Sequence, residues 1–596
     1  MGARWDSAWR LLIGLLWWAA ASSGCATPGG RATPGGRAEP GKPIVEFPSP
    51  AKLAELERQP AAIPNLDVGA VPSDGWTLEA QQGAINPDEP FQPHSSWEAA
   101  FAADAVQARP NVHLTRALAC VAREAGRFYL DAHAPPPENL QQFLIAACGA
   151  VAPTVGMSWI SGAVPDPIGD DDLLGRQRGQ LKTEVVAQLP DGATDAGFWY
   201  GRAHGHTIAI MTYAVTGVRW KSLAVVPDAQ GNATFEGELT QAADYITGYA
   251  NQGRLGVERC TIDPGVPRPR FRATCHLAKD DDTAWVQLLS APPQRVLAVP
   301  FAQILLRRTV DQPLAFRVQP YTQPHPVASA QDFSTAVVAS LNDVRIRGGL
   351  RPVQLAAAES ARATRLASHY FATALARSGG TQQSDEIALG LLAGWQIEGL
   401  IRDGLFTSSV APHTRDAAQW LDAALTSPVG RAALLAPEIE AVALGTVMLS
   451  QPDGLGAVVT GYRLYHGDDH SDDVKHLYAR LLAARQRLGL GMPFRLDGMQ
   501  HVMQAEFARI QSGQWQSRQA LQAALDQAVH RFGASMRGYV VETTSLDAFE
   551  IPEALVRRKQ LYFEIGVGHY RAPGAAWGQM VILVVFAADA PLTHEV

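Results

Sequence analysis

The chain has few cysteines and no excess of positive charge. Its 596 residues include five Cys, and 58 Asp and Glu outnumber 50 Lys and Arg, which gives a formal net charge of -8. Binding to nucleic acid, or to an anionic membrane through charge, requires clustered Lys and Arg, and an isoelectric point near 6.1 gives no sign of them. The composition therefore argues against a nucleic-acid partner and against a polybasic membrane patch.

Long apolar runs are also missing. The apolar stretch near the start, residues 11–21, is too short to cross a bilayer comfortably. Two basic residues, Arg4 and Arg10, precede it, and this combination is typical of a secretory signal. We therefore expect residues 1–25 to be a targeting segment that takes no part in the fold.

The end of this segment indicates a lipid anchor. It reads Ala-Ser-Ser-Gly-Cys up to Cys25, which resembles a bacterial lipoprotein cleavage site, although such sites more often have Leu where Ser22 stands. The resemblance implies that Cys25 is lipidated and holds the protein to a membrane. It also implies the outer membrane, because Ala26 is not the Asp that retains many lipoproteins at the inner membrane. An ordinary signal peptide with a free Cys25 is the alternative.

The other four cysteines form two local pairs. Cys120 lies close in sequence to Cys148, and Cys260 lies close to Cys275. We predict a disulfide for each pair, because export to an oxidising compartment lets disulfides persist. Cys25 is then left over, as a lipid on its sulfur requires. Four reduced, buried cysteines are the alternative.

Residues 26–94 predict a flexible tether. The hexapeptide Ala-Thr-Pro-Gly-Gly-Arg occurs twice within residues 26–37, and a Pro-rich composition continues beyond it. A stretch with so few apolar side chains buries too little surface to fold. The rest of the chain, which is 47% hydrophobic overall, is long enough for three or four cores.

Two domains are expected after the tether. Residues 95–217 combine helical periodicity with two strands around His204-Gly205-His206, which predicts an N-terminal α/β unit. Residues 218–312 contain short alternating runs separated by Gly, Pro and Asp, a spacing typical of an antiparallel, immunoglobulin-like β-sandwich. We find no catalytic motif in the sandwich.

Two motifs in the second half carry a family resemblance. Residues 341–355 read LNDVRIRGGLRPVQL, and residues 420–431 read WLDAALTSPVGR. They resemble the CAP superfamily of cysteine-rich secretory proteins, antigen 5 and pathogenesis-related proteins, also called SCP domains, in which LNxxRxxxGLxPL precedes W(x6)SPGHRxxLL. The resemblance covers residues 325–465 and implies a three-layered sandwich of helices around a sheet.

A second, more degenerate copy is expected at residues 466–590. Residues 481–496 read LLAARQRLGLGMPFRL, which repeats the Leu, Arg, Gly-Leu and Pro of residues 341–355. Closing strands are expected at residues 561–568 and 579–586, and the SPGHR element is missing. Residues 114–215 are a candidate third relative.

The cleft that the resemblance implies lacks one of its ligands. Many bacterial CAP members can hold a divalent metal through a Gly-Glu-Asn element and the His of SPGHR. Here Gly430 stands in place of that His, and Glu398 precedes Gly399 instead of following a Gly. His369, Glu398 and His413 remain as candidate binding residues. We assign no catalytic residue, metal or cofactor to them, and packed or surface positions are the alternative.

Histidine and aspartate are dense in the linker between the two copies. Residues 466–476 read HGDDHSDDVKH. Imidazoles and carboxylates together permit metal binding. Residues 471–473 also suit the N-cap and first turn of a helix from Val474, where their acceptors and charge favour the exposed N–H groups. We predict the helix cap and keep the metal site as the alternative.

The sequence thus predicts an α+β multidomain fold, with two CAP-like α-β-α sandwich units preceded by a β-sandwich and an N-terminal α/β unit. The expected function is binding or interaction at the cell envelope by a secreted, lipid-anchored, non-catalytic protein. Its ligand would be a lipid-like molecule, a peptide or a cell-wall polymer. A cell-envelope hydrolase or metal-dependent enzyme with a non-standard CAP cleft is the alternative.

Overall fold

The computed structural model describes most of the chain. The described residues are 25–26, 47–63, 75–78, 86–164, 168–243, 245–291, 298–309, 314–375, 381–450, 453–465, 470–533, 535–543, 546, 549, 551–571 and 574–587. The predicted signal peptide before Cys25, most of the predicted tether, and His466 of the linker lie outside the described residues.

The described chain forms two compact units. The first contains described residues of Ser49–Leu391 and Leu405–Gly461, and the second contains those of Leu392–Gly404 and Tyr462–Val596. The first unit includes an N-terminal domain, a β-sandwich and a middle domain, and the second includes a C-terminal domain. Three small elements of the first unit are helix α1 (Pro50–Leu56) and the paired strands β2 (Gly75–Thr77) and β15 (Ala315–Arg317).

The N-terminal domain is a four-stranded sheet with helices on both faces. Its elements are α2 (Ser96–Ala108), β3 (His113–Leu114), α3 (Arg116–Ala132), α4 (Glu138–Ala147), β4 (Gly156–Ala163), α5 (Asp170–Gln180), a π turn (Leu181–Val185), a 3-10 turn (Val186–Gln188), β5 (Asp195–Ala203) and β6 (His206–Ala214). Along β6, Ile208 packs with α3 and α4, whereas Ala209 packs with α2 and α5, as the two-residue repeat of a strand requires. His204 and Gly205 both have positive φ and form the expected tight hairpin turn.

The β-sandwich consists of two four-stranded sheets. Its strands are β7 (Val218–Leu223), β8 (Asn232–Leu239), β9 (Tyr245–Gln252), β10 (Gly256–Arg259), β11 (Thr261–Ile262), β12 (Arg270–His276), β13 (Thr283–Ala291) and β14 (Val299–Arg307). The sheet orders are β11-β12-β8-β7 and β10-β9-β13-β14. With β7 as strand A and β10 as strand C′, these are D-E-B-A and C′-C-F-G, the order of the immunoglobulin-type sandwich.

The middle domain is also a sheet between helical layers. Its elements are α6 (Ala330–Arg347), β16 (Gln354–Leu355), α7 (Ala357–Ala374), α8 (Thr381–Leu392), β17 (Leu400–Pro412), α9 (Ala417–Thr426), α10 (Pro428–Leu435), β18 (Ala441–Ser450) and β19 (Asp453–Tyr465), with β1 (Cys25–Ala26) at the sheet edge. Leu341 of α6 and Trp420 of α9 share a core with Val442 of β18. The opposite face of β18 contacts α7, where Gly445 meets Ala363.

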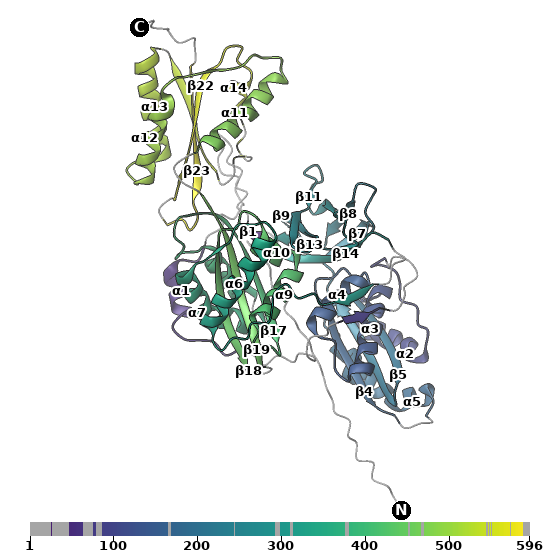
Figure 1. Cartoon of the computed structure of the whole chain (residues 1–596). Helices are drawn as coiled ribbons and strands as arrows, with labels where there is room; N and C mark the ends of the chain where they lie inside the picture. Colours follow the sequence, from purple (N-terminus) through teal and green to yellow (C-terminus); the bar gives the residue numbers. More distant parts are fainter. Residues whose placement is uncertain are drawn as a thin grey trace, which may run out of the picture. The chain divides into compact units, whose positions relative to one another are not determined.

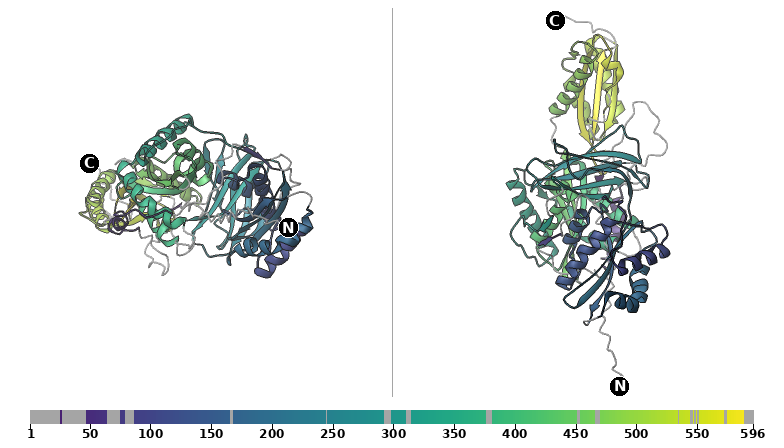
Figure 2. Two further views of the ribbon diagram at one scale, coloured as in Figure 1. Left: turned by 90° about the horizontal axis from the view of Figure 1, so that it is seen from below. Right: turned by 90° about the vertical axis from the view of Figure 1, so that its right-hand side faces the viewer.

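The C-terminal domain repeats this layered arrangement. Its elements are α11 (Ser471–Gln486), β20 (Phe494–Arg495), α12 (Met499–Gln511), α13 (Ser517–Phe532), β21 (Met536–Thr543), α14 (Glu553–Val556), β22 (Tyr562–Tyr570) and β23 (Gln579–Ala587). Helices α12 and α13 cover one face of the sheet, and α11 and α14 cover the other (Figure 1). The yellow strands and the green helices beside them are seen again in the right-hand view of Figure 2.

The three sheets that lie between helices share one strand order. The orders are β3-β5-β6-β4, β16-β18-β19-β17 and β20-β22-β23-β21. In each, a two-residue strand between the first two helices pairs in parallel with the penultimate strand. The first helix (α2, α6 or α11) packs on one face, and the second helix (α3, α7 or α12) packs on the other. The expected helix-then-closing-strand order is therefore present three times.

Glycine permits close contact between the second helix and the penultimate strand. A Cβ atom at Gly445 would lie 2.3 Å from the carbonyl oxygen of Ala363 on α7. A Cβ atom at Gly566 would lie 2.8 Å from the sulfur of Met503 on α12. Larger residues at these positions would push the helix off the sheet, which explains the glycines of the two closing-strand motifs.

A buried arginine fixes the end of the first helix in the middle and C-terminal domains. Arg345 donates to the carbonyl oxygens of Arg351, Leu434 and Ile439 at 2.6–3.1 Å. Arg485 makes the corresponding contacts in the C-terminal domain, with the carbonyls of Gly491, Leu555, Arg558 and Lys559. Both guanidinium side chains are fully buried. The repeated Arg of the two sequence motifs thus ties the helix to the loops that follow it.

The structure contains both predicted disulfides. Cys120 on α3 is bonded to Cys148 at the end of α4, and Cys260 is bonded to Cys275 on β12. Disulfides persist in oxidising, extracytoplasmic compartments. Among the described residues, no helix is both long enough and apolar enough to cross a membrane.

Candidate metal centre

Two potential metal ligands lie at the start of α11. The expected helix start at Val474 is wrong by nearly one turn, because α11 begins at Ser471 and His470 is its N-cap residue. His470 makes no side-chain cap hydrogen bond to the helix. Asp473 lies in the first turn, three residues after His470, so the two side chains share one face of the helix.

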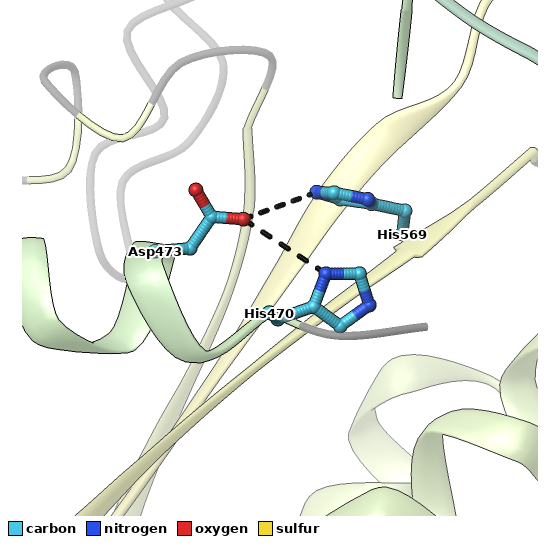
Figure 3. Close-up of side chains that lie close together, drawn as sticks. All are labelled: His470, Asp473 and His569. Carbon is cyan, nitrogen blue, oxygen red and sulfur yellow. Dashed lines mark ion pairs between the residues drawn. The ribbon is translucent and has the colours of Figure 1, made fainter. Parts of the chain in front are cut away.

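The third potential ligand comes from strand β22. Phe563, Ile565 and Val567 pack in the core beneath α11. Side chains alternate between the two faces of a strand, so His569 belongs to the same row and points toward α11. The helix start and the strand end therefore bring His569 to His470 and Asp473 (Figure 3).

Both imidazoles converge on one carboxylate oxygen. Oδ2 of Asp473 lies 3.5 Å from Nε2 of His569 and 3.9 Å from Nδ1 of His470. One ligand atom from each of the three residues falls within 4.8 Å of the other two. No other group of three or more His, Cys, Asp or Glu side chains meets this spacing in the part of the chain that the structure describes.

His569 is the most buried member of the cluster. Its relative exposure is 6%, and neither ring nitrogen has a hydrogen-bond partner among the described residues. Its ring stacks on Tyr465, and the edge of the His470 ring contacts it at a centroid distance of 4.2 Å. Burying a polar group without a partner is unfavourable, so this imidazole is a candidate for binding a ligand that the chain itself does not supply.

The spacing suits a transition metal. A tetrahedral zinc ion with bonds of about 2.0–2.1 Å holds its ligand atoms about 3.3 Å apart. The Asp473 distances to the two imidazoles are 3.5 and 3.9 Å, and all three ligand atoms lie within 4.8 Å of one another, so the side chains would draw closer together around the ion. Two imidazoles and one carboxylate favour zinc and its neighbours over calcium or magnesium, which prefer oxygen ligands.

The residues predicted for the CAP-like cleft form no group with metal-ligand spacing among the described residues. His369 lies on α7, where its Nε2 is 2.6 Å from the carbonyl oxygen of Gln59. Glu398 is exposed in the turn before β17. His413 is exposed just after β17 and has a positive φ of 61°. None of the three belongs to the metal-type cluster of the described chain.

The family's second histidine has no room at Gly430. A Cβ atom at Gly430 would lie 1.9 Å from the carbonyl oxygen of Ala424. The neighbouring Arg431 is buried and donates to the carbonyls of Leu425 and Gly253 and to the hydroxyl of Tyr321. The SPVGR segment therefore acts in packing at this position.

Sequence reasoning identified two of the three clustered residues but not the cluster. His470 and Asp473 lie in the segment for which a metal site was the alternative, and His569 was not considered. The sequence does place His569 on the same strand face as the apolar residues Phe563, Ile565 and Val567. His569 is far from α11 in the sequence, so the sequence alone does not show that it lies beside His470 and Asp473.

Comparison with known proteins gives the following matches. No family model matches the chain, and no curated protein matches it. Two solved structures resemble 41% of this chain over 88% of their own length. One is a cysteine-rich secretory protein from Staphylococcus aureus, at 10% identity and a TM-score of 0.17. The other is an extracellular protein containing an SCP domain from Bacillus anthracis, at 13% identity and a TM-score of 0.16.

Proposed function

We propose that this chain is a lipid-anchored, extracytoplasmic binding protein whose C-terminal domain holds a divalent transition metal of the zinc class. The ligands are His470, Asp473 and His569. The observation that carries the proposal is the convergence of the two imidazoles on Oδ2 of Asp473, at 3.5 and 3.9 Å, around a buried ring.

A metal accounts for this arrangement better than an ion pair does. The separations of 3.5 and 3.9 Å are within ion-pair range but longer than a good hydrogen bond, so an ion pair would be a weak one and would need a protonated imidazole. Two cationic imidazoles 4.2 Å apart would also repel each other. A metal requires neutral imidazoles and places all three ligand atoms around one point.

Two features support the proposed location, namely Cys25 with the residue after it and the two disulfides. A lipid on Cys25 holds the chain to a membrane, with outer-membrane placement favoured by Ala26. The two disulfides support an oxidising compartment. We expect the tether that follows Cys25 to leave the folded domains free to reach ligands near the membrane surface.

The three α-β-α domains are proposed to be copies of one ancestral CAP-like unit. Support comes from their common strand order, from the glycines on β18 and β22, and from the matching contacts of Arg345 and Arg485. His369, Glu398 and His413 remain proposed binding residues, and we assign them no catalytic role. The proposed ligand is a lipid-like molecule, a peptide or a cell-wall polymer.

A metal-dependent hydrolase is the second candidate. Three protein ligands leave the fourth position of a tetrahedral zinc open to water, as in catalytic zinc sites. Such a water would act as the nucleophile on an ester or amide of the cell envelope. We rank this function second because hydrolysis would also require a general base beside the metal, and all three residues of the cluster are proposed as ligands.

Metal binding is tested with the chain from Ala26 onward, which carries neither the lipid nor the predicted targeting segment. Zinc stoichiometry is measured by mass spectrometry of the metal, and affinity is measured by competition with a coloured chelator. We expect one zinc per chain, and at least a ten-fold weaker affinity for His569→Ala and for Asp473→Asn. His501→Ala changes an exposed histidine on α12 of the same domain and should leave affinity unchanged. Equal affinity for wild type and His569→Ala would disprove the metal centre.

The two candidate functions are separated by an activity assay. The zinc-loaded chain is incubated with muramyl peptides and with acyl esters, and release of product is followed. Turnover that disappears in His569→Ala and remains in His501→Ala would favour the hydrolase. Bound zinc without turnover supports the binding function.

A further inference from the structure

The C-terminal domain exposes a row of large apolar side chains on one short loop. Between the end of α11 and strand β20 the chain reads Leu488-Gly-Leu-Gly-Met492-Pro-Phe494. The exposed fractions of Leu488, Met492 and Phe494 are 53%, 66% and 52%. Scattered single apolar residues are common on protein surfaces, but three within seven residues form a patch that marks an interaction site.

The loop is held in place, so its exposure is a fixed property of the fold. Buried Arg485 donates to the carbonyl oxygen of Gly491 at 3.1 Å, and the N–H of Leu490 donates back to the carbonyl of Arg485 at 3.1 Å. The Phe494 ring stacks on Tyr562 with centroids 4.9 Å apart. The apolar tips therefore project from a braced turn.

Cationic side chains surround this patch. Arg485 also donates to the carbonyls of Arg558 and Lys559, which brings residues 555–559 beside the loop. Arg487, Arg557 and Lys559 are exposed, and Arg557 forms an ion pair with Glu553. Neither residues 481–496 nor residues 554–561 contain Asp or Glu. The local charge is thus positive although the chain as a whole is acidic.

The fold does not require these apolar residues. In the middle domain the turn after Arg345 reads Ile-Arg-Gly348-Gly349-Leu350, and its large exposed apolar side chain is Ile346 alone. The same buried-arginine contacts form there, although Gly348 stands in place of Leu488 and the stretch from the Arg to the Pro is one residue shorter. The extra apolar side chains of the C-terminal domain therefore serve something other than folding.

We propose that residues 488–494 form a membrane-docking loop that inserts its apolar tips into the headgroup region of an anionic bilayer. Leu, Met and Phe side chains gain by entering the boundary of the acyl chains. Arg487 and Lys559 lie at the height of the headgroups and attract anionic phosphates. This pairing of apolar tips with a cationic rim favours a bilayer over a protein groove. The inference rests neither on the metal centre nor on the lipid at Cys25.

The test uses the chain from Ala26 onward, so that neither a lipid nor the apolar residues 11–21 contribute. Co-sedimentation is measured with vesicles of phosphatidylglycerol and phosphatidylethanolamine and with vesicles of phosphatidylcholine alone. We expect binding to the anionic vesicles that exceeds binding to the neutral ones by at least ten-fold. Combined Leu488→Ser, Met492→Ser and Phe494→Ser changes should lower the anionic binding at least ten-fold.

Two further variants make the test specific. Arg487→Glu with Lys559→Glu should abolish the preference for anionic vesicles while leaving the apolar tips intact. A control with Val106→Ser, Val226→Ser and Val529→Ser removes three exposed apolar residues elsewhere and should bind as the parent does. Thermal unfolding of each variant verifies that it remains folded.

Two outcomes would overturn the inference. Equal vesicle binding by the parent and the loop triple variant would show that the loop does not dock. A concentration-dependent dimer, seen by light scattering and lost in the triple variant without vesicle binding by the parent, would assign the patch to a second copy of this chain.

Discussion

The imidazole of His569 stacks on the phenol ring of Tyr465, with ring centroids 4.0 Å apart and an angle of 29° between their planes. Tyr465 ends strand β19, and burial raises the pKa of its phenol above the ordinary value, so the ring is neutral at every physiological pH. A neutral, flat ring against one face of the imidazole limits how His569 can turn. The stacking thus holds Nε2 toward Asp473.

Removal of that ring should weaken the metal site. Groups that orient a metal ligand typically change affinity by about ten- to a hundred-fold when they are lost. We expect Tyr465→Ala to weaken zinc binding by about ten-fold and Tyr465→Phe to retain most of it, because the phenyl ring still stacks. Chelator competition measures both. Wild-type affinity in Tyr465→Ala would contradict an orienting role for the ring.

A histidine at position 430 should harm the protein. The carbonyl oxygen of Ala424 occupies the space that a Cβ at Gly430 needs, so Gly430→Ala and Gly430→His both force α9 and α10 apart. Overpacking of this kind costs about 1–3 kcal/mol. Chemical denaturation measures the loss, and Ala432→Gly on the same helix serves as a comparison. A Gly430→His protein that unfolds like the wild type would refute the steric argument.

The paired arginines should be equally important for folding. Burial lowers the pKa of Arg345 to about 10, yet its guanidinium stays charged at neutral pH and is satisfied by backbone carbonyls. Arg345→Met leaves those carbonyls unpaired and should lower the free energy of unfolding by about 3 kcal/mol. Arg485→Met should do the same in the C-terminal domain, whereas Arg487→Met, at an exposed site, should have little effect. Unchanged denaturation midpoints in both buried variants would contradict this.

Asp422 should make stability depend on pH. Burial raises the pKa of this carboxyl to about 6 from its ordinary value of 3.8, and nearby Asp416 adds to the rise. Because the folded-state pKa is the higher one, folding favours the protonated form. Its contribution is fully present below about pH 4 and is lost as pH rises through about 6.

Asp422→Asn tests this dependence. In the wild type, the Asp422 carboxylate accepts a hydrogen bond of 2.8 Å from the N–H of Tyr321. The side-chain oxygen of Asn can accept the same hydrogen bond. The variant should gain about 1 kcal/mol over wild type at pH 8, after allowance for partial solvent exposure, and should match it near pH 4. Melting temperatures across this range measure the difference. A gap between the two proteins that stays constant with pH would rule out the carboxyl as its source.

Cys25→Ser should release the protein from cellular membranes. The proposed lipid chain on Cys25 would hold the protein to the membrane. After a high-salt wash, which screens charge-based attachment, the serine variant should be soluble and the wild type should stay with the membrane. Ser22→Leu, which brings the cleavage site closer to the lipoprotein pattern, should behave as wild type. Membrane retention of the washed serine variant would count against lipidation.

Several features were predictable because short-range signals decide them. Short alternating runs predicted a β-sandwich at residues 218–312, where the structure has strands β7 to β14. The cysteine pairs are close in sequence, so their bonding needed little knowledge of the fold. Arg345 and Arg485 stand at the same place in the two sequence motifs, although carbonyl partners of each lie far along the chain.

The candidate site was less predictable. His369, Glu398 and His413 were chosen by analogy with a family cleft, and no local rule states which way a side chain points across a domain. Glycine at position 430 could be read as a lost ligand, but its steric cause is the carbonyl of Ala424.

The sequence by itself indicated the sandwich and the pairing of the cysteines, because local composition, periodicity and spacing encode these. It predicted two layered units and gave the third only as a candidate. Only the tertiary structure decided that His569 meets His470 and Asp473, and that the loop around Met492 is braced with its apolar side chains outward. The packing of α11 on β22 brings the three cluster residues together, and the hydrogen bond of Arg485 to Gly491 holds the loop. Such contacts depend on the summed geometry of many residues between the partners, which no single stretch of sequence contains.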